Sequence, residues 1–272
     1  MHHNLTNAAQ NAAQHFQHLQ QQPEPLLLPN IWDPASAVLA QSSGAKALAT
    51  SSAALAWALG YRDGEQLPLA ELQSALQRIL RVCRVPLSVD LEQGYSADPL
   101  QVASLVGQLA KMGVAGVNLE DGAGPAELLA AKISQCRHQL CGSAFFINAR
   151  TDVYLRGLAQ GDAAIALCHQ RGLLYQSAGA DALFIPGLNT LGSIQQIKAA
   201  LQIPISLMGW PAGASVQQLH AAGICRVSAG PAIFIAGANA TQAMLMQFLQ
   251  QSHQTPHQLQ PLLDYGRLDS LF

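Results

Sequence analysis

Short apolar runs recur along the chain and alternate with longer segments of mixed polarity. The runs are rich in Val, Ile, Leu and Phe, and they are apolar at consecutive positions, not at every second one. This pattern is typical of strands that are buried on both faces of a parallel sheet. We predict eight such strands: Leu26–Ile31, Ala45–Thr50, Pro86–Asp90, Val114–Glu120, Ala144–Ala149, Ala182–Pro186, Pro204–Met208 and Cys225–Ala229.

The segments between these runs carry helix start signals. Asp33 followed by Pro34 predicts an N-cap with Pro at the first helical position, and the Asp-Pro pair at Asp98 repeats the pattern. Ser215 is a further candidate cap. Eight βα units within residues 26–230 favour an α/β protein that folds as a closed (β/α)8 TIM barrel. An open doubly wound sheet is the structural alternative, although no G-x-G-x-x-G follows the first strand.

Additional helices are expected at both ends of the barrel. Within residues 1–24, Ala and Phe recur at helical spacing, which predicts an amphipathic lead-in helix. The apolar segment Pro231–Gln251 is expected to form the eighth barrel helix. Residues 252–272 are expected to form an extra helical tail, which a barrel does not need and which could exchange between subunits. We find no linker, so residues 1–272 are predicted to form a single domain.

Composition narrows the classes of partner. Of the 272 residues, 50% are hydrophobic and 11% are charged, the net charge is -2, and Lys and Arg form no cluster. A nucleic-acid partner is therefore not expected. No uninterrupted apolar run reaches the ~18 residues of a membrane span, so no membrane partner is expected. A cationic segment followed by an apolar core is not found near the start, which predicts a cytoplasmic location.

Charged side chains gather where the predicted strands end. Asp90 ends the third strand and Glu92 follows it, Glu120 ends the fourth strand, and Arg150 follows the fifth. The carboxyl ends of barrel strands meet at one mouth, where active sites of this fold lie. Carboxylates that crowd together repel one another unless a cation lies between them. Oxygen ligands of this kind suit Mg²⁺ (or Mn²⁺).

The remaining polar groups fit the recognition of an anion. Arg150 offers a planar fork that suits a substrate carboxylate. The second strand ends in Thr50, and Asp63 lies in the loop that follows. Each residue has a simpler interpretation: Asp90 could cap a loop, Arg150 could form a structural ion pair with Glu120, and Asp63 could belong to a turn. Their common position at one barrel rim favours a functional site.

Seven motifs along the chain resemble the isocitrate lyase and phosphoenolpyruvate mutase superfamily. The resemblance extends from about Leu26 to about Phe248 and is most specific where D-x-E-x-G-Y, L-E-D-G and A-R-T follow one another. The motifs are LLLPNIWDPASA, ALATSSAALAWALGYRDG, PLSVDLEQGY, GVAGVNLEDG, FFINARTDVYL, AGADALFIPGL and AGICRVSAGPA.

The resemblance implies roles for particular side chains. Asp90 matches the direct Mg²⁺ ligand, with Glu92 and Glu120 holding the metal largely through water. Arg150 matches the arginine that binds a substrate carboxylate. Asp63 matches a catalytic aspartate of the gating loop. The other matching positions are substrate-binding and comprise a wall and a turn that grips the substrate oxygens: Trp32, Thr50, Ser51 and Ser52.

The implied activity is Mg²⁺-dependent cleavage of a C–C or C–P bond in a small 2-oxo acid, such as an oxaloacetate- or phosphonopyruvate-like substrate, by an enzyme that forms a homo-oligomer, a dimer of dimers. The chain departs from the family at two places. It lacks the Lys-Lys-Cys-Gly-His loop of isocitrate lyases after Asp121, and it has Pro186 and Gly187 where lyases have Glu and mutases have His. Alternatives are phosphoenolpyruvate mutase activity, transfer like that of ketopantoate hydroxymethyltransferase, and a barrel that binds metal and dicarboxylate without turnover.

Overall fold

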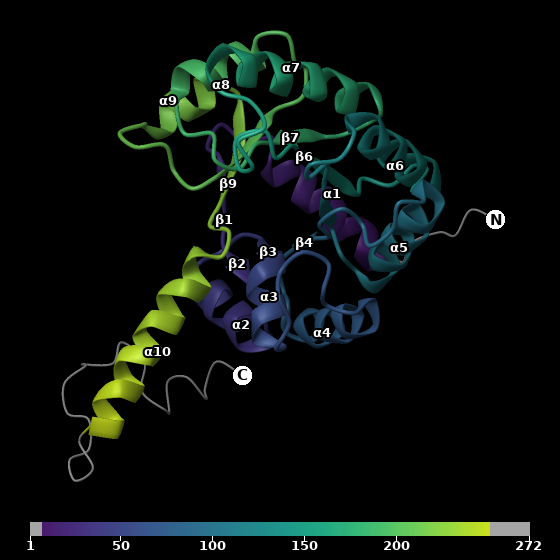
Figure 1. The fold of residues 1–272 in the computed structure, drawn as a ribbon. Helices are drawn as coiled ribbons and strands as arrows, with labels where there is room; N and C mark the ends of the chain where they lie inside the picture. Colours follow the sequence, from purple (N-terminus) through teal and green to yellow (C-terminus); the bar gives the residue numbers. More distant parts are fainter. Residues whose placement is uncertain (1–6, 251–272) are drawn as a thin grey trace.

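A parallel β-barrel surrounded by helices forms the body of the protein, as the alternation of apolar runs predicts (Figure 1). The computed structural model describes residues 7–250. Neighbouring strands all pair in parallel, in the order β1-β9-β8-β7-β6-β5-β4-β3-β2. The strands are β1 (Leu26–Leu28), β2 (Asn30–Ile31), β3 (Leu48–Thr50), β4 (Leu87–Asp90), β5 (Gly116–Glu120), β6 (Phe146–Arg150), β7 (Ala182–Phe184), β8 (Ile205–Met208) and β9 (Ile224–Ser228).

The first predicted strand closes the barrel. Pro29 divides it into two short strands because proline has no N–H to donate to a neighbouring strand. β1 pairs with β9 on one side, and β2 pairs with β3 on the other. The carbonyl of Pro29 still accepts a bond from the amide of Ala49, at 3.1 Å. The closed arrangement confirms the TIM barrel and rules out the open doubly wound sheet.

The expected caps begin the helices that link the strands. The Asp33 side chain accepts a hydrogen bond from the amide of Ser36 in a capping box, Asp98 caps the helix that starts with Pro99, and Ser215 caps a third. The helices that follow the strands are α2 (Pro34–Ser42), α3 (Ser52–Ala58), α4 (Leu69–Val82), α5 (Pro99–Met112), α6 (Ala126–Gln139), α7 (Gly161–Ser177), α8 (Leu191–Lys198) and α9 (Val216–Ala221).

The lead-in helix α1 (Asn7–Leu19) closes the amino-terminal end of the barrel. Its Phe16 is fully buried and meets Phe146, at the start of β6, edge-on with ring centroids 5.7 Å apart. A Cβ on Gly116 would lie 3.2 Å from the Phe16 ring and 2.6 Å from the carbonyl oxygen of Phe146. Only glycine therefore fits beside this plug.

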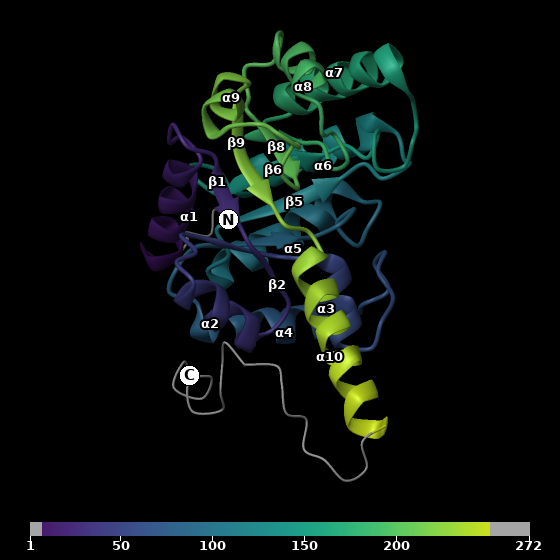
Figure 2. The same ribbon diagram turned by 90° about the vertical axis from the view of Figure 1, so that its left-hand side faces the viewer.

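The last described helix, α10 (Ala232–Gln250), does not pack on the barrel as an eighth barrel helix would. Both views show it extending away from the barrel (Figures 1 and 2). Several of its large apolar side chains are exposed: Ile233, Ile235, Leu245, Met246, Phe248 and Leu249. The helical segment was predicted correctly, but its packing was not. The predicted tail, residues 252–272, lies outside the described residues.

Helix α10 also qualifies the expectation that the chain has no membrane-spanning segment. Its window Ala232–Leu249 has a mean hydropathy of 1.3, so by length and composition alone this helix could cross a membrane. Uninterrupted apolar runs did not reveal it because Asn239, Thr241 and Gln242 break the sequence. One such helix is weak evidence for a membrane partner, and exposed apolar residues equally suit contact with another protein.

Candidate active site

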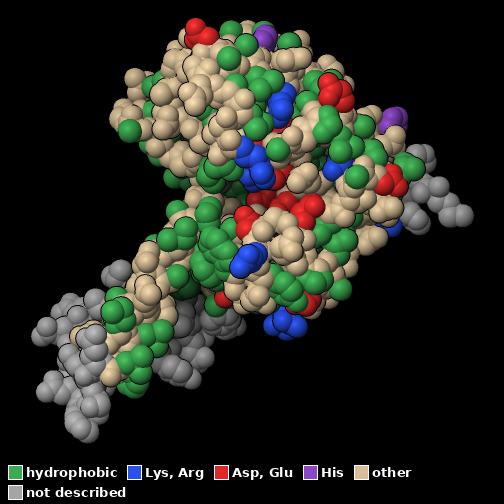
Figure 3. All heavy atoms as spheres, in the orientation of Figure 1, with side chains coloured by type: hydrophobic (Ala, Val, Ile, Leu, Met, Phe, Trp, Pro, Cys, Tyr) green, Lys and Arg blue, Asp and Glu red, His purple; other side chains and the backbone are tan. Residues whose placement is uncertain are grey.

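Acidic side chains gather in a hollow at the carboxyl ends of the strands. Figure 3 shows them at the middle of this face, with Lys or Arg side chains on either side of the hollow. Asp90 and Glu120 end β4 and β5, and Arg150 ends β6. The structure thus brings together three residues that sequence analysis placed at the same rim.

Asp90 is largely buried, with 11% of its side chain exposed. Its amide donates to the hydroxyl of Thr50 at 2.9 Å, which ties the ends of β3 and β4 together. Burial raises the pKa of the carboxyl group, Arg150 lowers it, the charge of Asp63 raises it again, and Ser52 lowers it by hydrogen bonding. The buried Oδ1 has no hydrogen-bond partner among the described residues. The carboxylate therefore keeps an acceptor position that no described residue uses.

Glu92 is held in an unusual backbone conformation by its neighbours. Its φ of 51° lies in the left-handed region, as do those of Glu65 and Tyr95. Its carboxylate accepts a hydrogen bond from the amide of Glu65 at 2.8 Å, and the Tyr95 amide donates to the Glu65 carboxylate at 2.7 Å. Strained backbone persists where the surroundings impose it, often at functional sites. Burial, followed by the charges of Asp90 and Asp63, raises the pKa of Glu92 to about 7.

Glu120 and Arg150 form a close ion pair, with 2.7 Å between Oε2 and Nη1. Burial nevertheless raises the pKa of Glu120 to about 8, because the nearby carboxylates of Asp90 and Asp152 oppose the effect of Arg150. The Arg150 pKa is also raised, because the charges of Asp90 and Glu120 and its hydrogen bond with Asp152 outweigh the effect of burial. The site therefore contains more carboxyl groups than its own arginine can neutralise.

Asp152 fixes the orientation of Arg150 from behind. It is fully buried, and its two oxygens accept Nε and Nη2 of Arg150 at 2.7 and 3.1 Å. A guanidinium has five N–H donors. Asp152 takes two of them, and Nη1 lies 2.7 Å from Glu120 in the ion pair, so the guanidinium keeps donors for an anionic ligand. Arg156 also donates to Asp152, at 3.0 Å.

A second buried carboxylate supports Asp152. Asp121 accepts the Asp152 amide at 3.0 Å, the Tyr175 hydroxyl at 2.5 Å and Nη1 of Arg171 at 2.7 Å. Sequence analysis did not assign a role to any of these residues. Asp121 and Asp152 stand at strand ends, but Arg171 and Tyr175 lie far away in the sequence on α7, and their spacing of four residues is the only local signal.

The remaining predicted site residues lie around this centre. Asp63, which is exposed, lies in the loop after α3, near enough for its charge to raise the pKa of Asp90. The side chain of Ser51 caps α3, accepting the amide of Ala54 at 3.3 Å. Trp32 follows β2 and meets Phe234 edge-on, with ring centroids 5.0 Å apart. The ligand-binding and catalytic roles of these residues stay predictions.

The donor set fits a divalent cation held by few protein ligands. Within residues 7–250, no group of three His, Cys, Asp or Glu side chains is arranged to hold a metal directly. Mg²⁺ usually takes one or two carboxylates and keeps several waters. The buried carboxylate of Asp90 and the raised pKa values of Glu92 and Glu120 fit one direct ligand with two carboxylates in reserve.

The connection between β5 and α6 is short. Gly124 donates to the carbonyl of Asp121 at 2.8 Å in a tight turn, and α6 begins at Ala126. The connection has no room for a long mobile loop. The structure thus agrees with the absence of the Lys-Lys-Cys-Gly-His segment.

Several known proteins are similar to this chain. An uncharacterized protein of Mycobacterium tuberculosis is 34% identical over 228 residues, which cover 82% of this chain and 84% of that protein. Oxaloacetate decarboxylase 2 of Pseudomonas fluorescens is 32% identical over 233 residues, covering 80% of this chain and 78% of the relative. 2-Methylisocitrate lyase of Aeropyrum pernix is 28% identical, covering 84% and 77%.

Solved structures share the fold. A putative phosphonomutase from Burkholderia cenocepacia has a TM-score of 0.81 and 34% identity, covering 87% of this chain and 99% of that one. A phosphonopyruvate hydrolase in complex with oxalate and Mg²⁺ has a TM-score of 0.82 at 19% identity, covering 96% and 94%. The family described as phosphoenolpyruvate phosphomutase matches residues 16–249. The chain therefore belongs to the phosphoenolpyruvate phosphomutase family, within the isocitrate lyase and phosphoenolpyruvate mutase superfamily, and is an enzyme that acts on C–C or C–P bonds.

Proposed function

We propose that the protein cleaves the C–C or C–P bond that joins C3 of a small 2-oxo acid to its leaving group, adjacent to the carbon that bears the carbonyl, in a reaction that depends on Mg²⁺ (or Mn²⁺). The observation that carries this proposal is the convergence of Asp90, Glu92 and Glu120 around Arg150 at the barrel mouth. A cation between the carboxylates and an anion on the free donors of Arg150 would together balance the charges of the site.

Each residue has a role in this scheme. Asp90 would hold the metal directly, and Glu92 and Glu120 would hold its waters. When bound, Mg²⁺ would supply the Lewis acidity that stabilises the negative charge of the enolate. Arg150 would bind the substrate carboxylate through its remaining N–H groups, beside the turn Thr50 to Ser52. Asp63, on the loop above, would contact the reacting group.

The departures from the family narrow the chemistry. No Cys or His lies between Asp121 and Cys136, so an acid–base step by a loop cysteine has no residue to carry it. Pro186 and Gly187 follow β7, and a Cβ on Gly187 would lie 3.3 Å from the amide nitrogen of Leu155. Isocitrate is therefore a poor candidate substrate, because its cleavage in the family uses that cysteine. An oxaloacetate- or phosphonopyruvate-like substrate suits the site better. The oxaloacetate decarboxylase relative supports the same choice.

A screen of 2-oxo acids with Mg²⁺, coupled to pyruvate detection, tests this proposal. We expect at least one oxaloacetate- or phosphonopyruvate-like acid to release pyruvate, and chelation of the metal to stop the reaction. The Asp90→Ala variant should lose both turnover and Mg²⁺-dependent oxalate binding measured by calorimetry. Equal oxalate binding by this variant would refute the metal assignment, and turnover in excess chelator would refute the dependence on metal.

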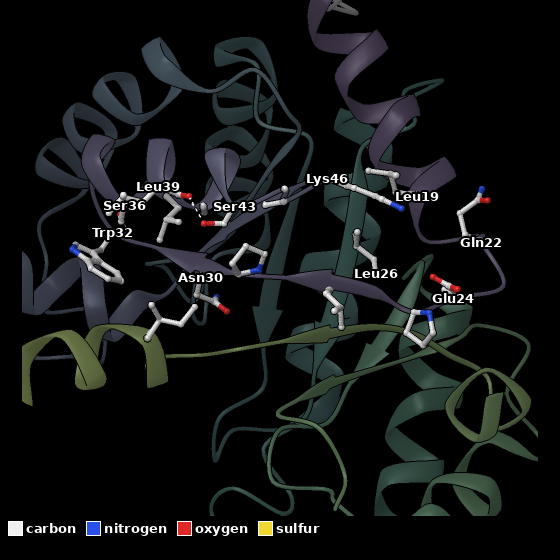
Figure 4. A pocket seen from close by; sticks show the side chains of 18 of the residues that line it. Leu19, Gln22, Glu24, Leu26, Asn30, Trp32, Ser36, Leu39, Ser43 and Lys46 are labelled. Atoms are coloured by element: carbon white, nitrogen blue, oxygen red, sulfur yellow. Dashed lines mark hydrogen bonds between the residues drawn. The ribbon is translucent and has the colours of Figure 1, made fainter. Parts of the chain in front are cut away.

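We further propose that α10 mediates the homo-oligomer, with the helix of one copy seated on the barrel of another. A groove of about 920 Å³ lies on the outer side of β1 and β2, beside α2 (Figure 4). Leu27, on β1, points outward and is 60% exposed. Each barrel strand normally has a helix on its outer face, and the extended direction of α10 leaves this position without one among residues 7–250.

The dimensions and chemistry of the two surfaces match. Nineteen residues of helix are ~28 Å long, and both α10 and the groove expose apolar side chains. Reciprocal exchange of the helix would bury both surfaces in a closed dimer. Light scattering tests this: Leu245→Glu with Phe248→Glu should convert the oligomer to monomers, whereas Gln242→Glu on the same helix should not. An unchanged mass for the double variant would contradict the exchange.

A further inference from the structure

The layer of side chains beneath the barrel mouth is polar, although such layers usually hold branched apolar residues. Asn118 on β5 accepts hydrogen bonds from Asn148 at 2.9 Å and from Nη2 of Arg226 at 2.6 Å. Ser206 on β8 donates to Asn148 at 3.0 Å. The contact between Arg226 and Asn118 joins β9 to β5 across the barrel interior.

Arg226 has the most side-chain nitrogen atoms without a hydrogen-bond partner in this layer. Its side chain is fully buried, and neither Nε nor Nη1 has a hydrogen-bond partner among the described residues. No carboxylate within residues 7–250 forms a salt bridge with it. An unpaired charge in a protein interior is costly, so this guanidinium needs a compensating group.

Asp90 is a carboxylate whose charge acts on Arg226. Asp90 and Asn118 are register partners on adjacent strands, and such strands lie ~4.8 Å apart. The Arg226 head group, bonded to Asn118, therefore lies beside Asp90, whose charge acts on it. Oδ1 of Asp90 is buried and lacks a partner, and so does the hydroxyl of Ser88, two residues earlier on the same face of β4.

These groups complement one another. Arg226 has two nitrogens, Nε and Nη1, whose N–H groups are unused. Asp90 supplies an unused acceptor, and the Ser88 hydroxyl can donate or accept. A buried water typically makes about three hydrogen bonds to otherwise unsatisfied polar groups. We propose that Arg226 is a positioning residue that holds Oδ1 of Asp90 through an enclosed water, leaving the rest of the carboxylate directed at the divalent cation. This inference rests on the proposed function only for its metal.

Two physical effects of Arg226 on cation binding have opposite signs. Its positive charge repels a bound cation, so removing the charge alone would strengthen Mg²⁺ binding. Its contact with Asp90 orients a metal-binding carboxylate, and the loss of such an outer partner typically weakens metal affinity about 10- to 100-fold. The sign of the change therefore separates positioning from simple repulsion.

Calorimetry of Mg²⁺ binding, in the presence of oxalate, to the full-length chain is the test. We expect Arg226→Met to weaken Mg²⁺ affinity about tenfold or more, and Arg226→Lys, which keeps the charge and a donor, to fall between this variant and the wild type. The matched control is Arg137→Met. Arg137 is a partly buried arginine at the amino-terminal end of the barrel, where it pairs with Asp181. Its loss should lower stability and leave Mg²⁺ affinity unchanged.

Unchanged or tighter Mg²⁺ binding by a folded Arg226→Met variant would overturn the inference. A crystal structure of the metal-free wild type gives a second measurement that needs neither metal binding nor a folded variant. A water bonded to both Arg226 and Oδ1 of Asp90 supports the inference, and its absence overturns it. If the wild type binds no Mg²⁺ with oxalate, the proposed function fails, and this crystal structure alone decides the contact.

Discussion

Replacing Asp152 by Asn probes how the substrate-binding arginine is held. Asp152 is fully buried and accepts three hydrogen bonds from guanidinium groups, two from Arg150 and one from Arg156. Asparagine has nearly the same shape but only one acceptor oxygen. Its amide NH₂ would face an N–H donor of an arginine, so the two-point contact with Arg150 would be lost.

The structure sets the expected magnitude. Hydrogen bonds to charged groups contribute about 1.5–3 kcal/mol each. Arg150 would keep its ion pair with Glu120 and one hydrogen bond to the amide oxygen of the substituted side chain. The substitution therefore removes about one hydrogen bond that orients the guanidinium for its ligand. We expect oxalate affinity in the presence of Mg²⁺ to fall about 10- to 100-fold, since ~1.4 kcal/mol corresponds to a factor of ten.

Calorimetric titration of oxalate at saturating Mg²⁺ measures this effect. The matched control is Asp98→Asn, because Asp98 is an exposed cap of α5 whose side chain accepts the amide of Leu100, and Asn is an equally good cap. The control should bind oxalate like the wild type. Wild-type affinity in the Asp152→Asn variant, with an intact fold by circular dichroism, would show that Arg150 does not depend on this contact or does not bind the ligand.

Three further outcomes are expected. The pKa values of Glu92 and Glu120 are raised above 4.5, to about 7 and about 8, so the folded metal-free protein retains protons that the unfolded chain loses. Its melting temperature in chelator should therefore fall as the pH rises from about 5 to 8. The fall should be smaller in the Glu120→Gln variant, and an equal fall would contradict the raised pKa of Glu120. Gly116→Ala places a Cβ 2.6 Å from the carbonyl oxygen of Phe146 and should cost about 1–3 kcal/mol in urea unfolding, whereas an unchanged midpoint would mean that the plug is loosely packed. Asp63→Ala should keep oxalate affinity and lose turnover, and persistent turnover would assign the chemistry to another residue.

Local patterns were sufficient to predict most of the barrel. Consecutive apolar residues mark strands because both faces of a parallel strand are buried, and Asp33 and Asp98 mark helix starts because their side chains satisfy free amides. The packing of α10 could not be predicted in this way. An apolar helix carries the same pattern whether it covers its own barrel or another surface, so its direction depends on contacts outside the segment.

The site was predictable only in part, for a similar reason. Asp90, Glu120 and Arg150 stand at strand ends, and the barrel topology brings strand ends together. The residues that orient them come from other elements. Arg171 and Tyr175 reach Asp121 from α7, and no periodicity in the sequence links positions so far apart. The sequence did not indicate a role for Arg226, which stands in an apolar strand. Its position facing Ser206 follows from an irregularity in the pairing of β8 with β9, and strand pairing cannot be read from one segment alone.

A crystal structure of the protein with Mg²⁺ and oxalate tests the central claim most directly. The account predicts a six-coordinate ion bonded to a carboxylate oxygen of Asp90 and to oxalate, with Glu92 and Glu120 contacting its waters and Arg150 bonded to the oxalate. Oxalate bound elsewhere, or an ion at the mouth that does not touch Asp90, would contradict it.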